Sequence, residues 1–209
     1  MSSSVRSLPG ARGLPVRALI RPGNLLPALV WALILYTQVI VSPFPPPLPN
    51  ALLVMITSGA LVLFIIRRDP TTTGSAWEMA VALLGTFIVA FLPGPQVPGT
   101  NWLATSIQVI GLLGWAAALA SLGRSLGIAP ADRGLIQHGL YRFVRHPMYA
   151  SEMVFFLGFF IAVPTWRSAV IILVWIGLQI IRLLREERIL AGYPDYRARV
   201  PWRLLPGVW

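Results

Sequence analysis

Long stretches of apolar residues alternate along the chain with short polar stretches. None of the apolar stretches shows the alternation with a period of two that is typical of membrane β-strands. About 20 apolar residues let a helix cross the hydrocarbon core of a bilayer, and hydrocarbon offers no hydrogen-bond partner to a backbone that is not helical. The sequence therefore predicts membrane helices at Leu25–Ser42, Leu48–Ile66, Trp77–Leu92, Trp102–Leu122, Tyr149–Val163 and Ser168–Leu184.

Composition supports this assignment. Hydrophobic residues make up 56% of the 209 residues and charged residues 11%, whereas about a quarter of the residues in a soluble domain are charged. We expect an all-α polytopic membrane protein, a bundle of about five to six transmembrane helices with a C-terminal cytoplasmic cap. Its expected parts are a cytoplasmic N-terminal tail (1–24), N-terminal transmembrane helices (25–122) and a C-terminal part (123–209).

The charges indicate how the bundle is oriented. The net charge of +10 comes from arginines next to the apolar segments, and the positive-inside rule then places both termini and the polar loops in the cytoplasm. Membrane lipids, and no nucleic acid, are the expected partner of this charge. An arginine-rich chain without lysine is typical of a GC-rich genome, so the bacterial inner membrane is the expected location; the oligomeric state is not predicted. Without cysteine and with two histidines, no metal site is expected.

Polar residues gather in the stretch Gly139–Glu152, GLYRFVRHPMYASE, where the fifth apolar segment begins. Pro147 suits the first turn of a helix, and we expect the backbone N–H groups before it to be free to meet a ligand. Glu152 lies about one turn further into the segment, and an ionisable residue there indicates a function. Tyrosine and arginine also anchor helices at the membrane surface, which is the alternative interpretation.

A second polar cluster, IIRLLREERIL, ends the sixth apolar segment. Arg182 and Glu186 are four residues apart and share a helix face, so they either pair with each other or hold different ligands. The C-terminal stretch contains Tyr193, Tyr196 and Arg199. It is expected to form either an interfacial cap or a lid that excludes water from both clusters.

The motif GLYRFVRHPMY, a helical hairpin and the pattern REERIL…YPDYRARVP together resemble the superfamily of isoprenylcysteine carboxyl methyltransferases and phospholipid methyltransferases, over roughly Leu122–Pro206. The resemblance implies that residues 123–209 form a catalytic part that binds S-adenosylmethionine and releases S-adenosylhomocysteine at the cytoplasmic face, and that methylates a lipophilic substrate. The residues that it assigns to cofactor binding are Ile136, Tyr141, His146, Pro147, Met148, Tyr149 and Glu186, and the stretch Arg133–Ile136 matches the same segment more loosely.

The same resemblance assigns roles to two arginines. Arg182 falls where the carboxyl methyltransferases hold an arginine near the substrate carboxylate, and Arg199 matches a second arginine that closes over the site. We therefore expect Arg182 and Arg199 to be catalytic, and Arg182 and Glu152 to contact the substrate. The family commonly has glycine two residues after the RHPxY tyrosine. Ser151 stands there in this chain, which puts a close helix contact at this point in question.

The favoured function is methylation of a carboxylate on a lipophilic molecule, such as a lipid or a prenylated substrate. A carboxylate is already ionised, so that Arg182 needs only to orient it, whereas an amine must first lose a proton to Glu152, Glu187 or His146. The alternatives are a phospholipid amine N-methyltransferase, an NADPH-dependent membrane reductase of the sterol-reductase type, whose members end in a similar tyrosine-rich tail, and a membrane scaffold without activity.

Overall fold

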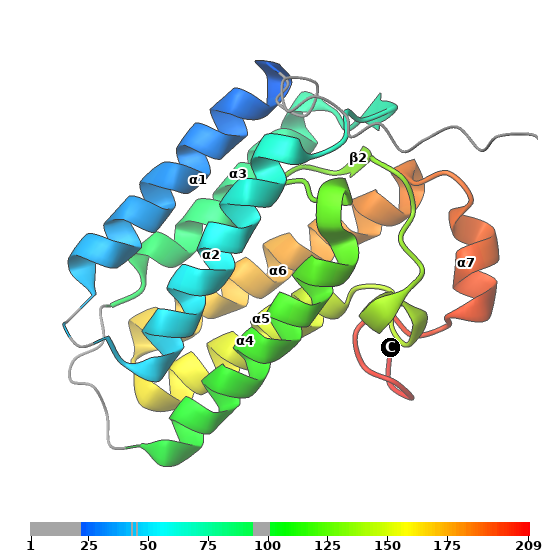
Figure 1. The fold of residues 1–209 in the computed structure, drawn as a ribbon. Helices are drawn as coiled ribbons and strands as arrows, with labels where there is room; N and C mark the ends of the chain where they lie inside the picture. Colours follow the sequence, from blue (N-terminus) through cyan, green and yellow to red (C-terminus); the bar gives the residue numbers. More distant parts are fainter. Residues whose placement is uncertain (1–21, 43, 45, 94–100) are drawn as a thin grey trace, which may run out of the picture.

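The computed structural model describes residues 22–42, 44, 46–93 and 101–209; the expected N-terminal tail lies outside them up to residue 21. Its elements follow one another in an order that Figure 1 shows from blue to red. They are α1 (Pro22–Val41), α2 (Leu48–Ile66), β1 (Thr72–Thr73), α3 (Ala76–Phe87), η2 (Ile88–Phe91), α4 (Trp102–Leu122), η3 (Gly123–Ser125), β2 (Ala131–Asp132), η4 (Gly139–Arg142), α5 (Pro147–Ala162), α6 (Trp166–Ile189) and α7 (Tyr193–Arg199).

The predicted all-α membrane fold is confirmed, and each predicted segment is helical. Within the described residues, four spans are long and apolar enough to cross a membrane: Gly23–Val41, Leu48–Ile66, Trp102–Ser125 and Trp166–Ile189. The apolar helices Ala76–Phe91 and Pro147–Ala162 are shorter. At 1.5 Å per residue, the 16 residues of α5 extend only about 24 Å, against a hydrocarbon core of about 30 Å.

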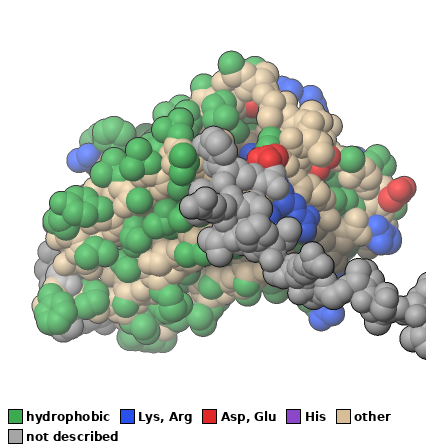
Figure 2. All heavy atoms as spheres, turned by 45° about the horizontal axis from the view of Figure 1, so that its top comes forward, with side chains coloured by type: hydrophobic (Ala, Val, Ile, Leu, Met, Phe, Trp, Pro, Cys, Tyr) green, Lys and Arg blue, Asp and Glu red, His purple; other side chains and the backbone are tan. Residues whose placement is uncertain are grey.

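The bundle carries apolar side chains both inside and outside. Its core includes Phe64, Leu112, Phe156 and Trp175, which are buried between the helices. Many large apolar side chains on α1, α2, α4 and α6 are exposed instead, as a surface that faces lipid requires. Figure 2 shows hydrophobic side chains spread over the helical body, while the acidic side chains visible in that view lie at one end.

Helices α4 and α5 pack closely at Ser151, the position where the family commonly has glycine. A Cβ atom on Gly111 of α4 would lie 2.5 Å from the backbone nitrogen of Phe155, and one on Gly114 would lie 2.6 Å from the Ser151 Oγ atom. The Ser151 hydroxyl donates to the Pro147 carbonyl of its own helix (2.8 Å). The close contact at Ser151 is therefore present, and the glycines that allow it there lie on α4.

The polar end of the bundle is held together by loops that are distant in sequence (Figure 1). Strands β1 and β2 pair antiparallel, with Thr72 opposite Asp132. The buried Asp132 carboxylate accepts from the Gly134 nitrogen (3.0 Å) and from the Ala191 nitrogen just after α6 (3.1 Å). The segment between α4 and α5 is thereby fixed against both the α2–α3 loop and the end of α6, which positions the residues described next.

Candidate functional site

The chain enters α5 through the sequence Arg145-His146-Pro147. Pro147 is the first residue of the helix, as its fixed φ angle and missing N–H group favour. The backbone nitrogens of Arg145 and His146 donate to the carbonyls of Trp202 and Arg203, both at 2.9 Å. The expectation that these N–H groups are free to meet a ligand is therefore wrong, because the C-terminal segment satisfies them.

The two polar clusters of the sequence meet between α5 and α6. The Tyr149 hydroxyl donates to Glu186 Oε1 at 2.5 Å, and His146 Nδ1 lies 4.0 Å from Glu186 Oε2. Tyr149 is buried and one-quarter of the Glu186 side chain is exposed. Among the described residues, no ion pair joins Arg182 to Glu186. The internal Arg182–Glu186 pair, one of the two alternatives, is therefore not formed, and the alternative that the two residues hold different ligands stays a prediction.

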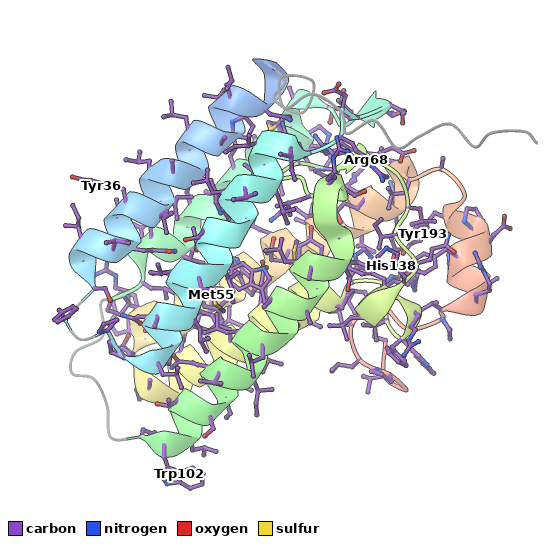
Figure 3. The ribbon with its side chains drawn as sticks, in the orientation of Figure 1. Tyr36, Met55, Arg68, Trp102, His138 and Tyr193 are labelled. Carbon is purple, nitrogen blue, oxygen red and sulfur yellow. The ribbon has the colours of Figure 1, made fainter. Side chains whose placement is uncertain are left out.

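Glu187 connects the start of α5 to the C-terminal segment. Its carboxylate lies 3.1 Å from Arg145 Nη1 and 3.2 Å from His146 Nε2, and it accepts from Arg203 Nε (2.9 Å) and Nη2 (3.1 Å). Arg145 also donates to the Tyr193 hydroxyl (3.1 Å) and the Pro201 carbonyl (3.1 Å). In Figure 3, Tyr193 lies on the side of α7 that faces the bundle. Sequence reasoning offered Glu187 only as a candidate base, and Arg203 was not singled out.

A pocket of about 720 Å³, its open mouth included, lies at this polar end. We call it the tyrosine pocket, because Tyr141, Tyr149, Tyr193 and Tyr196 line it. Of the residues assigned to cofactor binding, Ile136, Tyr141, His146, Met148, Tyr149 and Glu186 line it as well, while Pro147 is buried at the start of α5. The remaining lining residues are Leu122, Ser125, Gly127, Ala129, Ala131, Arg133, Gly134, Leu135, Arg145 and Leu190.

The tyrosines of this pocket that lie outside the membrane helices are uncharged at neutral pH. Burial raises the pKa of Tyr141 and of Tyr193 well above that of a free phenol, and it raises the pKa of Tyr196 to about 12. Tyr196 donates its hydroxyl hydrogen to the Tyr141 carbonyl at 2.5 Å. Neutral phenol rings present electron-rich faces, which attract cations.

A second pocket, also of about 720 Å³ with its opening, lies between the transmembrane helices. We call it the inter-helix pocket. Its walls are mainly apolar, and Trp31, Ile56, Phe64, Trp115, Phe156 and Trp175 are among them. A polar group forms one part of the wall: Gln179 donates to Glu152 Oε2 (2.8 Å) and accepts from Arg182 Nη1 (2.7 Å). Arg182 Nη2 donates to the Ile128 carbonyl at 2.5 Å, and its Nε is buried without a partner.

The two pockets adjoin each other, since Gly127 and Met148 line both. The guanidinium of Arg182 lies 5.5 Å from the centre of the Tyr149 ring, so the polar walls of the two pockets also meet there. Arg182 and Glu152, the residues expected to contact the substrate, therefore line the inter-helix pocket, while the predicted cofactor residues other than Pro147 line the tyrosine pocket.

Arg199 lies away from both pockets. Its exposed side chain extends from the end of α7 and donates from Nη2 to Gln137 Oε1 at 2.7 Å. It is not among the residues that line the tyrosine pocket or the inter-helix pocket. Among the described residues, the arginine of the C-terminal segment that bonds to the double glutamate is Arg203.

Sequence reasoning missed Gln179, and it included Arg133 only through the stretch Arg133–Ile136, which matches the cofactor-binding segment of the family loosely. Gln179 interrupts an apolar run, and a polar residue inside a membrane helix is a signal that was available. Arg133 gave no comparable signal, because a basic residue in a loop is equally expected from the positive-inside rule.

Comparison of the chain with known protein families gives a match to one family model. The model of the phospholipid methyltransferase family matches residues 100–193, from the start of α4 to the start of α7. No curated protein matches the chain significantly. The family match confirms the resemblance predicted from the sequence, and the matched residues include the RHPMY motif, Glu152, Gln179, Arg182 and the double glutamate.

Proposed function

We propose that this chain, which matches the model of the phospholipid methyltransferase family over residues 100–193, methylates a lipophilic acceptor with S-adenosylmethionine as the methyl donor. The observation that carries the proposal is the pair of adjoining pockets. The tyrosine pocket is lined by charged and aromatic groups at the polar end of the bundle, and the inter-helix pocket is mainly apolar and lies among the membrane helices. A water-soluble donor and a lipid-soluble acceptor each find a pocket of matching character.

The tyrosine pocket fits the donor in chemistry. Its four tyrosine rings suit a sulfonium and an adenine, and Glu186 and Arg133 add one charge of each sign. When bound, S-adenosylmethionine supplies a methyl group on a positively charged sulfur. Tyr149 and Met148, which line this pocket next to the inter-helix pocket, are the residues placed to orient it.

The polar wall of the inter-helix pocket favours an amine as the acceptor. Both Nη atoms of Arg182 already donate to protein carbonyl oxygens, so a carboxylate acceptor would share the guanidinium with Gln179 and the Ile128 carbonyl. Glu152 bonds to Gln179 through Oε2, and its Oε1 has no hydrogen-bond partner among the described residues. Glu152 can therefore attract an ammonium group and accept its proton. A lipophilic carboxylate oriented by Arg182, the acceptor favoured from sequence, is the second candidate.

A titration tests the methyl donor. Purified protein in detergent or nanodiscs is titrated with S-adenosylhomocysteine and, separately, with NADPH by isothermal titration calorimetry. We expect saturable binding of S-adenosylhomocysteine alone, followed by incorporation of labelled methyl groups when the protein is incubated with membrane lipids and labelled S-adenosylmethionine. Binding of NADPH alone would contradict the methyltransferase assignment and support a membrane reductase. Binding of neither compound would support a membrane scaffold without activity.

A pair of variants tests the acceptor. Glu152→Gln keeps an oxygen for Gln179 but removes the base, so methyl transfer to an amine lipid should fall by about 10²-fold or more. The affinity for S-adenosylhomocysteine should not change, because Glu152 does not line the tyrosine pocket. Arg182→Lys is the comparison variant. A loss of activity in Arg182→Lys with full activity in Glu152→Gln, and lipid methyl esters rather than methylamines in mass spectra, would identify the carboxylate as the acceptor.

A further inference from the structure

Large apolar side chains are exposed on the C-terminal segment, outside both pockets. In the range Pro201–Trp209, Val208 is 76% exposed and Leu205 is 55% exposed. Single exposed apolar side chains are ordinary, whereas a group of neighbouring ones indicates a contact surface. We call this surface the C-terminal rim. It consists of Phe143, Trp202, Leu205, Val208 and Trp209.

Phe143 belongs to the rim although it lies far from the other members in the sequence. The carbonyl of Trp202 accepts from the Arg145 nitrogen, and that of Arg203 accepts from the His146 nitrogen, both at 2.9 Å. The C-terminal segment therefore runs along the stretch of chain that leaves η4, which is where Phe143 stands. The rim is one surface built from two segments, and both are fixed to the start of α5.

The rim lies beside the bundle, at the level where the membrane helices end. Helix α4 has 21 residues, and at about 1.5 Å per residue it is just long enough to cross a hydrocarbon core of about 30 Å. Gly139 of η4 packs on Ser121 in the last turn of α4, so closely that a Cβ on Gly139 would collide with the Ser121 side chain. In Figure 1 the C-terminal segment, drawn in red, lies beside this end of the bundle rather than beyond it. The fold thus places the rim at the depth of the lipid headgroups.

Two aromatic side chains of the rim have an arginine against the ring. The guanidinium of Arg142 lies 4.6 Å from the centre of the Phe143 ring, and that of Arg203 lies 5.0 Å from the centre of the Trp209 ring. Aromatic and arginine side chains together are typical of the membrane interface, because the ring enters the acyl boundary while the charge stays with the headgroups. The side chains of the rim therefore suit the depth at which they lie.

The charge around the rim is positive. Residues 137–145 and 193–209 contain five arginines and a single acidic residue, Asp195. Two of the arginines are bound to Glu187 within the protein. The other three are exposed: Arg142, Arg197 and Arg199. A second copy of this chain would bring the same positive charge to the contact, whereas anionic lipid headgroups attract basic side chains that stand next to a membrane segment. Charge complementarity therefore favours an anionic membrane surface.

We propose that the C-terminal rim docks into the headgroup layer of the leaflet at the polar end of the bundle. Its apolar side chains reach the acyl boundary, and the exposed arginines around it bind anionic phospholipid headgroups. This contact is independent of the proposed function. It supports the C-terminal segment, whose carbonyls bind the N–H groups at the start of α5, on the side that the protein leaves uncovered.

Site-directed spin labelling tests the depth of the rim, because the sequence contains no cysteine that would give a background signal. A nitroxide is attached to Val208→Cys in the full chain, which is reconstituted in nanodiscs of phosphatidylcholine and phosphatidylglycerol. Oxygen concentrates among acyl chains and a nickel chelate stays in water, so the nitroxide at position 208 should collide more often with oxygen. Ala198→Cys, at an exposed position of α7, is the matched control and should collide more often with the chelate.

Two results of this measurement would contradict the proposal. Equal access of the nickel chelate to positions 208 and 198 would show that the rim lies in water. Access of neither reagent to position 208 would show that protein covers the rim, either a second copy or another chain. Both results would overturn the inference and leave the proposed function untouched.

Competition between lipids tests the headgroup charge. Solubilised protein is offered equal amounts of phosphatidylglycerol and phosphatidylcholine, and the lipids that it retains are counted by native mass spectrometry. The wild type should prefer phosphatidylglycerol, and Arg142→Gln combined with Arg197→Gln should lower this preference by about fivefold for each arginine. Arg142→Lys combined with Arg197→Lys keeps the charge and should keep the preference. A preference that is absent from the wild type, or unchanged in the glutamine variant, would overturn the anionic partner.

Discussion

Glu187 shows how much depends on a single side chain in this structure. Its carboxylate is 9% exposed and contacts Arg145, His146 and Arg203, which belong to the entrance of α5 and to the C-terminal segment. Removing one partner of a buried ion pair leaves an uncompensated charge, and this costs more than the pair itself contributes. Glu187 is therefore expected to hold the C-terminal segment over the tyrosine pocket, whereas Glu186 faces the pocket.

Adjacent substitutions separate the two glutamates. Glu187→Gln should destabilise the fold by about 3 kcal/mol, because Arg145 loses its counter-charge in a buried position. Glu186→Gln can still accept from Tyr149 and should cost less than about 1 kcal/mol. Thermal unfolding of the solubilised protein gives the order of the two melting temperatures. Equal melting temperatures would show that Glu187 does not stabilise the C-terminal segment.

At the scale of elements, the contact between α4 and α5 positions the start of α5. Gly111 and Gly114 let α4 approach the backbone of α5 at Ser151 and Phe155, where there is no room for another atom. Small residues at such contacts are typical of membrane helices, because close packing replaces the hydrophobic driving force that lipid removes. The position of Tyr149, two residues before Ser151, depends on this contact.

An alanine scan of glycines tests the contact. Gly111→Ala should destabilise the protein by about 1–3 kcal/mol, since the new methyl group meets backbone atoms that cannot move alone. Gly59→Ala in α2 is the matched control, because nothing lies within 4 Å of its added Cβ; it should be neutral or stabilising by up to about 1 kcal/mol through helix propensity. Similar losses of melting temperature in both variants would contradict this account of the packing.

At the scale of the whole molecule, the structure places the ends of the helices that bear the polar clusters at one end of the bundle (Figure 1). The tyrosine pocket opens there, and the turn between α5 and α6 lies at the opposite end. Helices that cross the membrane would then place the tyrosine pocket and that turn on opposite sides of it. The positive-inside rule predicts that the tyrosine pocket is cytoplasmic.

Labelling tests this topology, and the absence of cysteine from the sequence removes any background. The substitution Arg142→Cys introduces a cysteine at an exposed position of η4, and Trp166→Cys introduces one at the exposed start of α6. In intact bacterial cells, a maleimide that cannot cross membranes should label the cysteine at position 166 and reach that at position 142 only after permeabilisation. The reverse pattern would invert the proposed orientation.

The sequence was enough to predict most of the helices. It was also enough to predict that some of the site residues share a pocket. The ranges Leu48–Ile66 and Trp102–Leu122 were predicted residue for residue. Pro147 at the start of a helix followed from its ring, and Tyr149 and Glu186 were predicted to share a pocket and do. The expected free N–H groups of Arg145 and His146 were wrong, because their partners lie more than fifty residues further along the chain.

The sequence by itself determined the helices and the polar end, because lipid forces any long apolar segment to bond its backbone internally and each such segment can be recognised from its own residues. Only the tertiary structure decided which hydrogen-bond acceptor each polar side chain contacts. Glu186 rather than Glu187 faces the pocket, and Arg182 is bound by Gln179 and Ile128. Both arrangements depend on how α5, α6 and the C-terminal segment pack against one another. These contacts join positions far apart in the sequence, and a local pattern of apolar and polar residues contains no information about them.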